Sequence, residues 1–533
     1  MSAPSDSQRP PSQSYGAASS PQRIRPVADM EKIVSLCKRR GFIFQSSEIY
    51  GGLNGCWHYG PLGVELKRNL KNYWWRVMVH ERDDVVGMDG SILMNRAVWK
   101  ASGHEDTFSD PMVECDICKR RYRNDQIPSR TPFRTQVHII FSDEEGHPHG
   151  DCLSIGGESP KDVRQKTKIQ SEYLKLGSKL IDIKLDPGIT NDPVRSCPHC
   201  GGEISEPRAF NLMFKTYVGA TEDESSITYL RPETAQSIFV QFKNILEVSR
   251  KKLPFGIAQI GKAFRNEINP RNFTFRSREF EQMELEYFCR AEEGMKLLDY
   301  WLEERLKFYE NIGIPREKLH ARKVPDEERA FYSKGTYDIE YDFPFGRQEL
   351  EGVAYRTDYD LSQHIKASGK SLDYFDEETK QRFVPHVVEP SAGVDRTVLA
   401  LICEAYSEDE APDEKGKMEK RIVLRFHPRM APIKCGIFPL LRNNEQLVAK
   451  AKEIVDLLRP HTKAFYDESG AIGRRYRRQD EIGTPFGVTV DFETLGEKDA
   501  ALRDTVTLRE RDSMKQERVA INDLTGILTS RIS

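Results

Sequence analysis

Two neighbouring segments near the middle of the chain carry charged side chains at every second position. The first, residues 256–267, ends in Arg265 and Glu267. After a loop, residues 276–288 continue the alternation. In a strand, where side chains alternate between faces, one face would carry Arg276, Arg278, Phe280, Gln282, Glu284 and Glu286. Met283, Leu285 and Tyr287 would face a core.

This pattern is compatible with two kinds of surface. Buried charges need partners or a ligand, and guanidinium groups suit phosphates because they offer paired donors and a permanent charge. The alternation therefore favours an anion-binding sheet face that also holds carboxylates. A solvated antiparallel face with cross-strand ion pairs is the alternative, and the pattern alone leaves both open.

Four cysteines form two Cys-x-x-Cys pairs, which are Cys115 with Cys118 and Cys197 with Cys200. Two such pairs can complete a tetrahedral Cys₄ zinc site, which is structural because no coordination position stays open. We therefore predict structural zinc, with free thiols as the alternative. The isolated cysteines are expected to be ordinary core or surface thiols; they are Cys37, Cys56, Cys152, Cys289, Cys403 and Cys435.

A basic run surrounds one aromatic residue near the C-terminus, in Gly473-Arg-Arg-Tyr-Arg-Arg478. Arginines beside an aromatic ring can contact phosphates and stack on bases. A solvated helix face is the alternative from the pattern alone.

The composition limits the class of protein. The chain has 533 residues with 80 basic and 83 acidic side chains, a formal net charge of −3, and a hydrophobic fraction of 38%. These values exclude a disordered protein and argue against a DNA-coating one. Cysteines are too sparse for a disulfide scaffold, and no apolar run is long enough to cross a membrane. The N-terminus lacks the apolar core of a signal peptide, so we expect a cytoplasmic enzyme.

The elements that must position these residues fall into successive regions. We expect helices over 31–42, 60–78, 291–310 and 394–406, and strands alternating with helices after residue 421. The predicted regions are a disordered tail (1–28), a first catalytic part (29–110), an insertion with the cysteines (111–205), a catalytic core (206–407) with an inserted segment (312–385), a charged linker (408–420) and a separate α/β domain (421–533).

Three short motifs, in this order, resemble those of class II aminoacyl-tRNA synthetases. Gly60-Pro-Leu-Gly63 before a helix is similar to motif 1, the dimer motif. Phe264-Arg-Asn-Glu267 with Arg276 and Phe280 is similar to motif 2, and Gly393-Val-Asp-Arg396 is similar to motif 3. The words FIFQSSEIYGG, YLRPETAQSIFV, REFEQMELEYF and VEPSAGVDR resemble the glycyl-tRNA synthetases of the homodimeric type, over about residues 30–530.

The resemblance implies an α+β fold. An antiparallel sheet flanked by helices would carry an insertion domain and a C-terminal α/β anticodon-binding domain. It also implies a homodimeric glycine–tRNA ligase that uses ATP with Mg²⁺ and has glycine and tRNA(Gly) as partners.

The resemblance implies catalytic roles for Arg265, at the α-phosphate, and for Arg396. Arg396 and Arg276 would reach the pyrophosphate end, Phe280 would stack on adenine with Arg396 covering its other face, and Glu349 would bind Mg²⁺. The implied ATP-binding residues are Arg265, Asn266, Glu267, Phe275, Arg276, Phe280, Glu349, Leu350, Gly393, Val394, Asp395 and Arg396.

Glycine selection requires carboxylates for the ammonium group and no room at Cα. The positions that match glycine-contacting ones are Arg123, Glu233, Phe280, Glu281, Gln282, Met283, Glu284, Glu389, Pro390, Ser391, Ala392 and Gly393. The resemblance supports zinc only in part, since members of the family differ in keeping these cysteines.

Two alternatives stay open from the sequence. A synthetase for proline, threonine or serine would replace the glutamates, and FEQME and EPSAG argue against it. A non-catalytic, nucleic-acid-binding paralogue would lose the motif 2 and 3 arginines, which are present in this chain.

Overall fold

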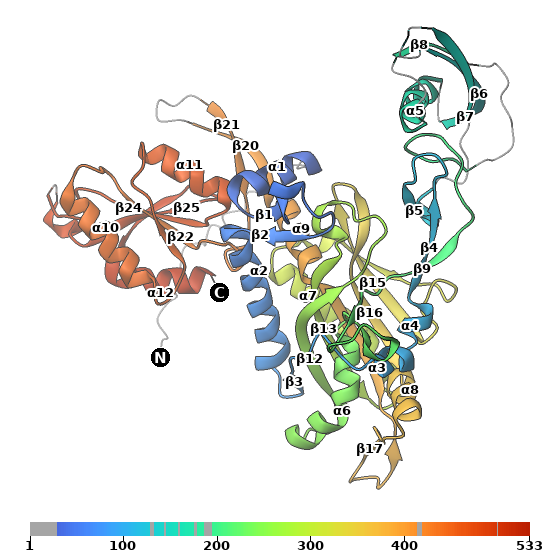
Figure 1. The fold of residues 1–533 in the computed structure, drawn as a ribbon. Coiled ribbons are helices and arrows are strands. Elements are labelled where there is room, and N and C mark those ends of the chain that lie inside the picture. Colours follow the sequence, from blue (N-terminus) through green and yellow to red (C-terminus); the bar gives the residue numbers. More distant parts are fainter. Residues whose placement is uncertain are drawn as a thin grey trace, which may run out of the picture.

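The computed structural model describes residues 29–127, 133–142, 145, 147–157, 160–174, 179–185, 195–412, 418–497 and 499–532. The predicted tail, 1–28, lies outside the described residues. A central domain carries the cysteine-bearing insertion on one side and the C-terminal domain on the other (Figure 1).

The central domain is built on a seven-stranded sheet in the order β14-β15-β16-β19-β13-β12-β3. The strands are β3 (Val85–Gly87), β12 (Phe255–Phe264), β13 (Glu279–Cys289), β14 (Leu319–Lys323), β15 (Gly335–Phe343), β16 (Gly346–Thr357) and β19 (His386–Gly393). Neighbours are antiparallel except β12 and β3, which are parallel. The segment 312–385 was expected to be an insertion. It instead supplies three strands of this sheet, because its polar residues alternate with buried ones.

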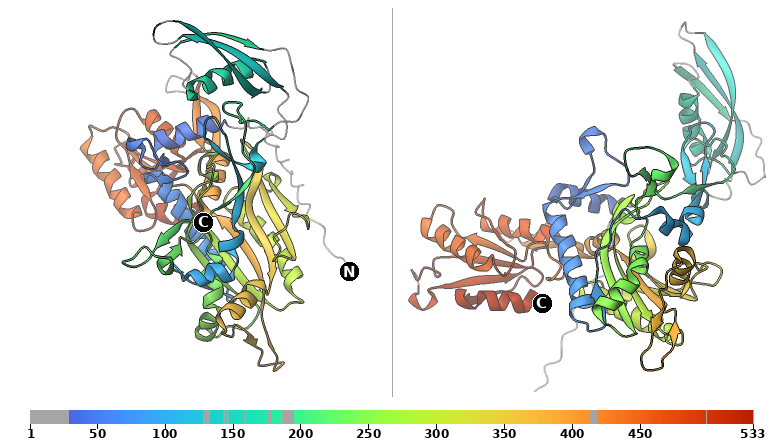
Figure 2. Two further views of the ribbon diagram at one scale, coloured as in Figure 1. Left: turned by 45° about the vertical axis from the view of Figure 1, so that its right-hand side comes forward. Right: turned by 60° about the horizontal axis from the view of Figure 1, so that its bottom comes forward.

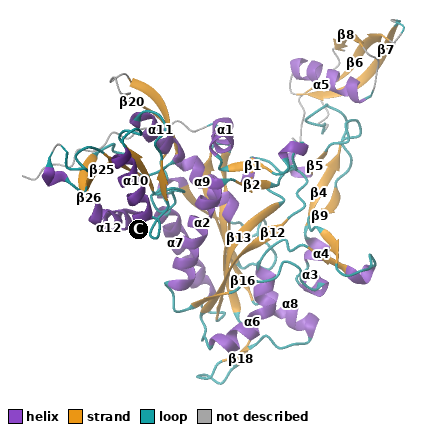
Figure 3. Ribbon diagram, turned by 60° about the vertical axis from the view of Figure 1, so that its left-hand side comes forward, coloured by secondary structure: helices purple, strands orange, loops and turns teal. Residues whose placement is uncertain are grey.

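Helices cover both faces of the sheet (Figure 3). On one face lie α2 (Pro61–Trp75), α7 (Gly294–Asn311) and α9 (Val394–Ala405), in a core that includes Met283, Leu285 and Tyr287. On the other lie α6 (Ala235–Ser249) and α8 (Tyr359–Ser368), packed through Phe239, Phe288 and Leu361. The predicted apolar face of 279–289 is therefore confirmed.

Capping residues define the ends of α1 and the start of α2. In α1 (Met30–Arg40), the Asp29 side chain accepts from the Glu31 backbone amide, and Gly41 ends the helix at φ 74°. Pro61 is the first residue of α2, where its missing amide hydrogen is not needed. Between them β1 (Ile43–Gln45) pairs with β2 (Trp57–Tyr59).

The insertion consists of two small sheets (Figure 2). Nearest the central domain, β4 (Ser109–Glu114) pairs with β5 (Arg121–Arg123) and β9 (Arg208–Asn211). Beyond it, β6 (Phe133–Ser142) lies between β7 (Pro148–Gly157) and β8 (Lys179–Leu185), with α5 (Pro160–Tyr173) packed alongside. Short elements precede and follow this module; they are α3 (Arg96–Ala101), α4 (His104–Thr107), β10 (Lys215–Tyr217) and β11 (Ile227–Tyr229).

The C-terminal domain is a five-stranded sheet in the order β23-β22-β24-β25-β26. Its strands are β22 (Cys435–Pro439), β23 (Ala464–Tyr466), β24 (Phe486–Val490), β25 (Thr505–Glu510) and β26 (Gln516–Ala520). The apolar sides of α10 (Glu445–Leu458) and α12 (Ile521–Ile532) pack into one core with this sheet. The third helix is α11 (Ile472–Ile482). The predicted α/β alternation therefore appears here.

The region between the two domains differs from the predicted linker. Instead of an irregular run over 408–420, β20 (Tyr406–Pro412) and β21 (Met418–Leu424) form an antiparallel pair. β21, which includes the first residues of the region predicted as a separate α/β domain, thus belongs to this hairpin and not to the C-terminal sheet. Arg421 holds the hairpin against α11. Its guanidinium group is buried between Asp409 (2.6 Å) and Asp480 of α11 (2.6 Å). Among the described residues, no helix is long and apolar enough to cross a membrane.

Candidate active site

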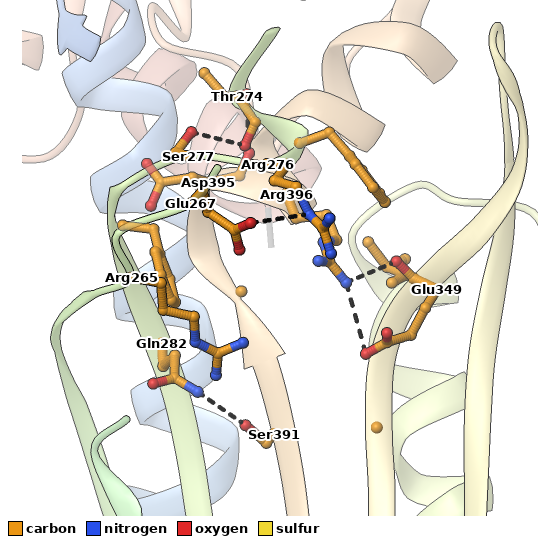
Figure 4. A pocket seen from close by; sticks show the side chains of 15 residues that line it. Arg265, Glu267, Thr274, Arg276, Ser277, Gln282, Glu349, Ser391, Asp395 and Arg396 are labelled. Atoms are coloured by element: carbon orange, nitrogen blue, oxygen red, sulfur yellow. Dashed lines mark hydrogen bonds and ion pairs between the residues drawn. The ribbon is translucent and has the colours of Figure 1, made fainter. Parts of the chain in front are cut away.

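A pocket opens on the sheet where β12, β13, β16 and β19 meet the first turn of α9 (Figure 4). Most side chains predicted to bind ATP gather around it. Its lining residues are Arg265, Glu267, Thr274, Phe275, Arg276, Ser277, Phe280, Gln282, Glu349, Leu350, Gly352, Ser391, Gly393, Asp395 and Arg396.

Arg265 follows directly on β12 and stands at one side of the pocket. Its Nε donates to the Pro232 carbonyl oxygen at 3.1 Å. Its guanidinium carbon lies 5.4 Å from the ring centres of both Phe108 and Phe280. Two aromatic rings and one backbone contact therefore orient this guanidinium group.

The motif 2 loop adds an acid–base pair. Glu267 is buried, and its Oε2 lies 3.6 Å from Nε of Arg276. Burial lowers the pKa of Arg276, although Glu267 opposes the shift. The backbone amide of Asn266 donates to the Leu212 carbonyl oxygen at 2.7 Å, which attaches the loop to the chain that returns from the insertion.

Arg396, from the first turn of α9, faces Phe275 across the pocket mouth. Its guanidinium carbon lies 4.4 Å from the Phe275 ring centre, and its Nη1 donates to the Glu349 carbonyl oxygen at 2.9 Å. The short helix over Phe273–Phe275 turns the Phe275 ring toward α9. Phe280, the ring expected to stack on adenine, lines the same pocket, so the expectation that adenine lies between Phe280 and Arg396 stays a prediction.

Deeper along β13 and β19 lies a group of buried carboxylates. Atoms of Glu284, Glu286 and Glu389 all lie within 4.8 Å of one another. Glu284 accepts hydrogen bonds from the Ser391 hydroxyl (2.8 Å) and the Thr234 backbone amide (3.1 Å). Ser391 and Gln282 join this group to the pocket, since both also line it.

Arg356 of β16 neutralises part of this negative charge. Its Nη1 donates to both oxygens of Glu389 at 2.9 Å, and its Nε donates to Asp360 of α8 at 2.8 Å. No hydrogen-bond partner contacts either carboxylate oxygen of Glu286 within the described parts of the chain. Burial, reinforced by Glu389, raises the pKa of Glu286 well above its usual 4.5.

Glu233 lies at the edge of the same group, just before α6. It accepts from Gln236 Nε2 at 3.0 Å, and its Oε2 lies 3.3 Å from His104 Nε2. Burial opposes ionisation here, but His104 and then Arg356 hold the pKa of Glu233 below its usual range. Glu233 is thus an ionised carboxylate, whereas burial and neighbouring Glu233 raise the pKa of Glu284.

Several residues expected at the substrate have side chains elsewhere. Met283, Ala392 and Val394 belong to the core on the opposite face, and Pro390 shares the Ala392 side of β19 by alternation. Glu281 points to α2, where Lys67 (2.8 Å) and Lys71 (2.9 Å) bind it and lower its pKa to about 2 against the effect of burial. Because side chains alternate along β13, Glu281 and Glu284 lie on opposite faces of the sheet.

Asp395 lines the pocket, but its carboxylate is already bonded. Oδ1 accepts from the Tyr59 hydroxyl (2.6 Å) and Lys67 Nζ (2.7 Å), and Oδ2 accepts from the Glu281 backbone amide (2.7 Å). Asp395 therefore ties motif 3 to motifs 1 and 2. Arg123 pairs with Asp110 (2.9 Å) and Asp125 (3.0 Å) and is not among the lining residues.

Sequence reasoning missed Arg356, His104 and Phe108. Arg356 had a signal, because its spacing to Asp360 is that of an i,i+4 ion pair where a strand meets a helix. His104 and Phe108 are single residues in a region without a motif, and only the fold brings them to Glu233 and Arg265.

The four cysteines of the insertion converge at its base. Cys115 and Cys200 sulfurs lie 3.5 Å apart, Cys118 and Cys197 sulfurs 3.7 Å apart, and all four side chains are buried. A tetrahedron with zinc–sulfur bonds of about 2.3 Å has sulfurs about 3.8 Å apart, so the donor set fits zinc. Gly201, at φ 71°, permits the second turn, since a Cβ there would lie 2.6 Å from the Gly156 carbonyl oxygen.

The basic run of α11 is mainly structural. Arg475 is buried and donates to the Gly470 carbonyl oxygen at 3.0 Å. Tyr476 bonds Thr489 at 2.7 Å, Arg477 lies 3.0 Å from Glu419, and Arg478 lies 2.7 Å from Asp467. Arg474 is the exposed member of the run, and RNA binding by this helix stays a prediction.

Comparisons with known proteins agree with this arrangement. Residues 214–406 match the family described as "tRNA synthetase class II core domain (G, H, P, S and T)", and residues 434–531 match "Anticodon binding domain". The chain is 48% identical to the glycine–tRNA ligase of Thermobifida fusca over 95% of this chain and 98% of that one. It is also 48% identical to that of Thermus thermophilus, over 95% and 99%. A similar relative is the glycine–tRNA ligase of Streptomyces coelicolor, at 48% identity over 94% and 98%. With motif arginines around a pocket that ends in buried carboxylates, this chain belongs to the glycine–tRNA ligase family of class II tRNA synthetases.

Proposed function

We propose that this chain joins glycine to ATP, forming glycyl-adenylate and pyrophosphate, and then transfers glycine to the 3′ end of tRNA(Gly). The observation that carries the proposal is the continuity of the pocket. Phosphate-binding arginines line its mouth, and Gln282 and Ser391 connect it to the buried carboxylates.

ATP would lie across the mouth of the pocket. Adenine would stack on Phe280, with Arg396 covering its other face, and Phe275, whose ring centre lies 4.4 Å from the Arg396 guanidinium carbon, would border the same site. Glu267 would accept a hydrogen bond from the adenine amino group. Arg265 would contact the α-phosphate, and Arg276 the pyrophosphate end.

Glycine would lie deeper, with its ammonium among the carboxylates. Glu233 is ionised, whereas burial raises the pKa of Glu284 and raises that of Glu389 to about 8. A bound ammonium would pair with Glu233 and favour the ionised form of the other two, so its binding is favoured. A methyl group on Cα would meet side chains that are fixed by hydrogen bonds. Packing against a methyl gives only about 1–3 kcal/mol, so steric rejection by this charged wall is the stronger basis for selecting glycine.

The chemistry follows from positioning and charge. A glycine carboxylate oxygen attacks the α-phosphorus, a new P–O bond forms, and the bond to the bridging oxygen of pyrophosphate breaks. Arg265 stabilises the charge that accumulates on the α-phosphate oxygens. In the second step a terminal ribose hydroxyl of tRNA attacks the glycyl carbonyl carbon, and AMP leaves.

Two metal ions are part of the proposal. Glu349 would hold Mg²⁺, which supplies positive charge to the phosphates, and its side chain is about half exposed at the mouth. Zinc would be structural at the four cysteines.

The protein would act as a cytoplasmic homodimer whose C-terminal domain binds the anticodon. In it the predicted regions would act together; they are 29–110, 111–205, 206–407 and 421–533.

The test is amino-acid-dependent exchange of pyrophosphate into ATP, with each of the twenty amino acids. We expect exchange with glycine alone. Arg265→Ala should reduce it at least about a thousandfold, the scale of a lost transition-state contact. Arg382→Ala is the matched control, because this guanidinium is exposed and paired with Asp373. Exchange with another amino acid would contradict the glycine site, and no exchange with any would contradict adenylation.

A further inference from the structure

The sheet that carries the first cysteine pair also reaches the active site. β4 begins directly after Phe108 and ends directly before Cys115. β5 and β9 pair with it on either side. The cysteine cluster therefore lies at one end of three paired strands, and residues that contact motif 2 lie at the other.

Phe108 makes the most direct of these contacts. Its ring centre lies 5.4 Å from the Arg265 guanidinium carbon, the same distance as the Phe280 ring. No carboxylate forms an ion pair with Arg265 among the residues that the structure describes. The guanidinium is thus oriented by rings and stays available to a phosphate.

Contacts of Leu212 and His104 also fix this end of the sheet. The Leu212 amide donates to the Phe108 carbonyl oxygen at 3.0 Å, and the Leu212 carbonyl oxygen accepts from the Asn266 amide at 2.7 Å. His104, whose ring lies 5.3 Å from that of Phe108, contacts Glu233 at 3.3 Å. A shift of β4 would therefore move Phe108 relative to Arg265.

We propose that Phe108 is a positioning residue for the adenylation step, which orients Arg265, and that a metal ion on the cysteine cluster fixes Phe108 through β4. The inference rests on the proposed function, because it assigns Arg265 to the phosphates of ATP. It gives the insertion a role in ATP binding as well as in folding.

Phe108→Leu tests the ring, since it keeps an apolar side chain of similar size. We expect KM for ATP to rise about three- to thirtyfold, the range of a cation–π contact, while KM for glycine stays within about twofold. Phe108→Tyr should restore KM for ATP. Phe375→Leu, on β17 (Tyr374–Phe375) and away from the pocket, is the matched control. Equal changes in both KM values, or none, would overturn the proposal.

The metal is tested by direct binding of ATP in a calorimeter, which needs no turnover. Metal content is measured first, and zinc is then removed with a chelator. We expect metal-free wild type to bind ATP more weakly, and removal to have a smaller effect in Phe108→Leu, because both changes act on one contact. Isolation without metal, or unchanged ATP affinity after its removal, would overturn the coupling. A wild type that binds ATP but shows no glycine-dependent exchange would instead contradict the proposed function.

Discussion

At the scale of single residues, Arg356 organises the deepest part of the site. It bonds Glu389 and Asp360, helps His104 to hold the pKa of Glu233 low, and limits the rise that burial and Glu233 cause in the pKa of Glu284. Without this cation the buried carboxylates would repel one another in a region of low dielectric. The residual negative charge is what an ammonium group can use.

Glu284 and Glu281 make a matched pair for testing which glutamate faces glycine. We expect Glu284→Gln to raise KM for glycine about 10- to 100-fold, because an amide replaces a carboxyl group that could ionise and pair with the bound ammonium. Glu281→Gln should leave KM for glycine within about twofold, since Glu281 bonds Lys67 and Lys71 on the other face. Steady-state exchange at saturating ATP measures both. The opposite ranking would support the glycine contact that the resemblance implies for Glu281.

The raised pKa of Glu286 predicts that the free energy of unfolding depends on pH. Its pKa is raised well above 4.5 in the folded state, so the folded chain holds a proton that the unfolded chain releases. The stabilisation is therefore complete below pH 4.5 and is lost as the pH rises through the folded-state pKa. Glu286→Gln stays neutral and should flatten this decline. Urea unfolding of both proteins from pH 5 to 9 measures it, and parallel curves would contradict the assignment.

At the scale of elements, α2 connects the three motifs. Lys67 lies on this helix and bonds Asp395 at 2.7 Å and Glu281 at 2.8 Å. The pairs join the helix to the start of α9 and to β13, which carry Arg396 and Phe280 on their pocket side. Since Lys67 is almost fully buried, these ion pairs cannot be exchanged for water without cost.

The basic helix α11 allows a comparison of two adjacent arginines. Arg475 is buried on backbone carbonyls, so Arg475→Met should destabilise the C-terminal domain by about 1–3 kcal/mol for each carbonyl oxygen left unpaired. Arg474 is exposed, so Arg474→Ala should leave stability unchanged and weaken tRNA binding. Thermal unfolding and filter binding at fixed salt separate the two effects. Equal loss of stability in both variants would show that exposure does not distinguish them.

At the scale of the whole molecule, exposed apolar side chains lie in the loop that precedes the motif 1 helix in the chain. Ile49 is 88% exposed, Tyr50 86% and Leu53 52%, all in the loop between β1 and β2. This is unusual for neighbouring large apolar residues on a free surface, and it is typical of an interface. The position fits the proposed homodimer.

Ile49→Glu is therefore expected to shift the protein toward monomer. A buried, unpaired carboxylate at a dimer contact costs several kcal/mol, enough to raise the dissociation constant more than about a hundredfold. Val248→Glu is the control, since Val248 is 81% exposed on α6. Sedimentation velocity over a range of concentrations gives the result, and an unchanged dimer would place the interface elsewhere.

The sequence alone determined the features that depend on local pattern. Period-two alternation separated Met283 and Leu285 from Glu284, and the spacing of the cysteine pairs predicted their convergence. Short motifs with fixed roles, such as those around Arg265 and Arg396, are recognised because their chemistry needs neighbouring residues in the chain.

Tertiary structure decided what depends on contacts between distant segments. It placed strands from 312–385 in the central sheet, set Arg396 against Phe275, and brought Phe108 to Arg265 and His104 to Glu233. Most arginines of α11 bond to other residues of this chain, which the sequence run did not predict. These outcomes have no local signal, because packing and ion pairing are decided by which strands lie side by side.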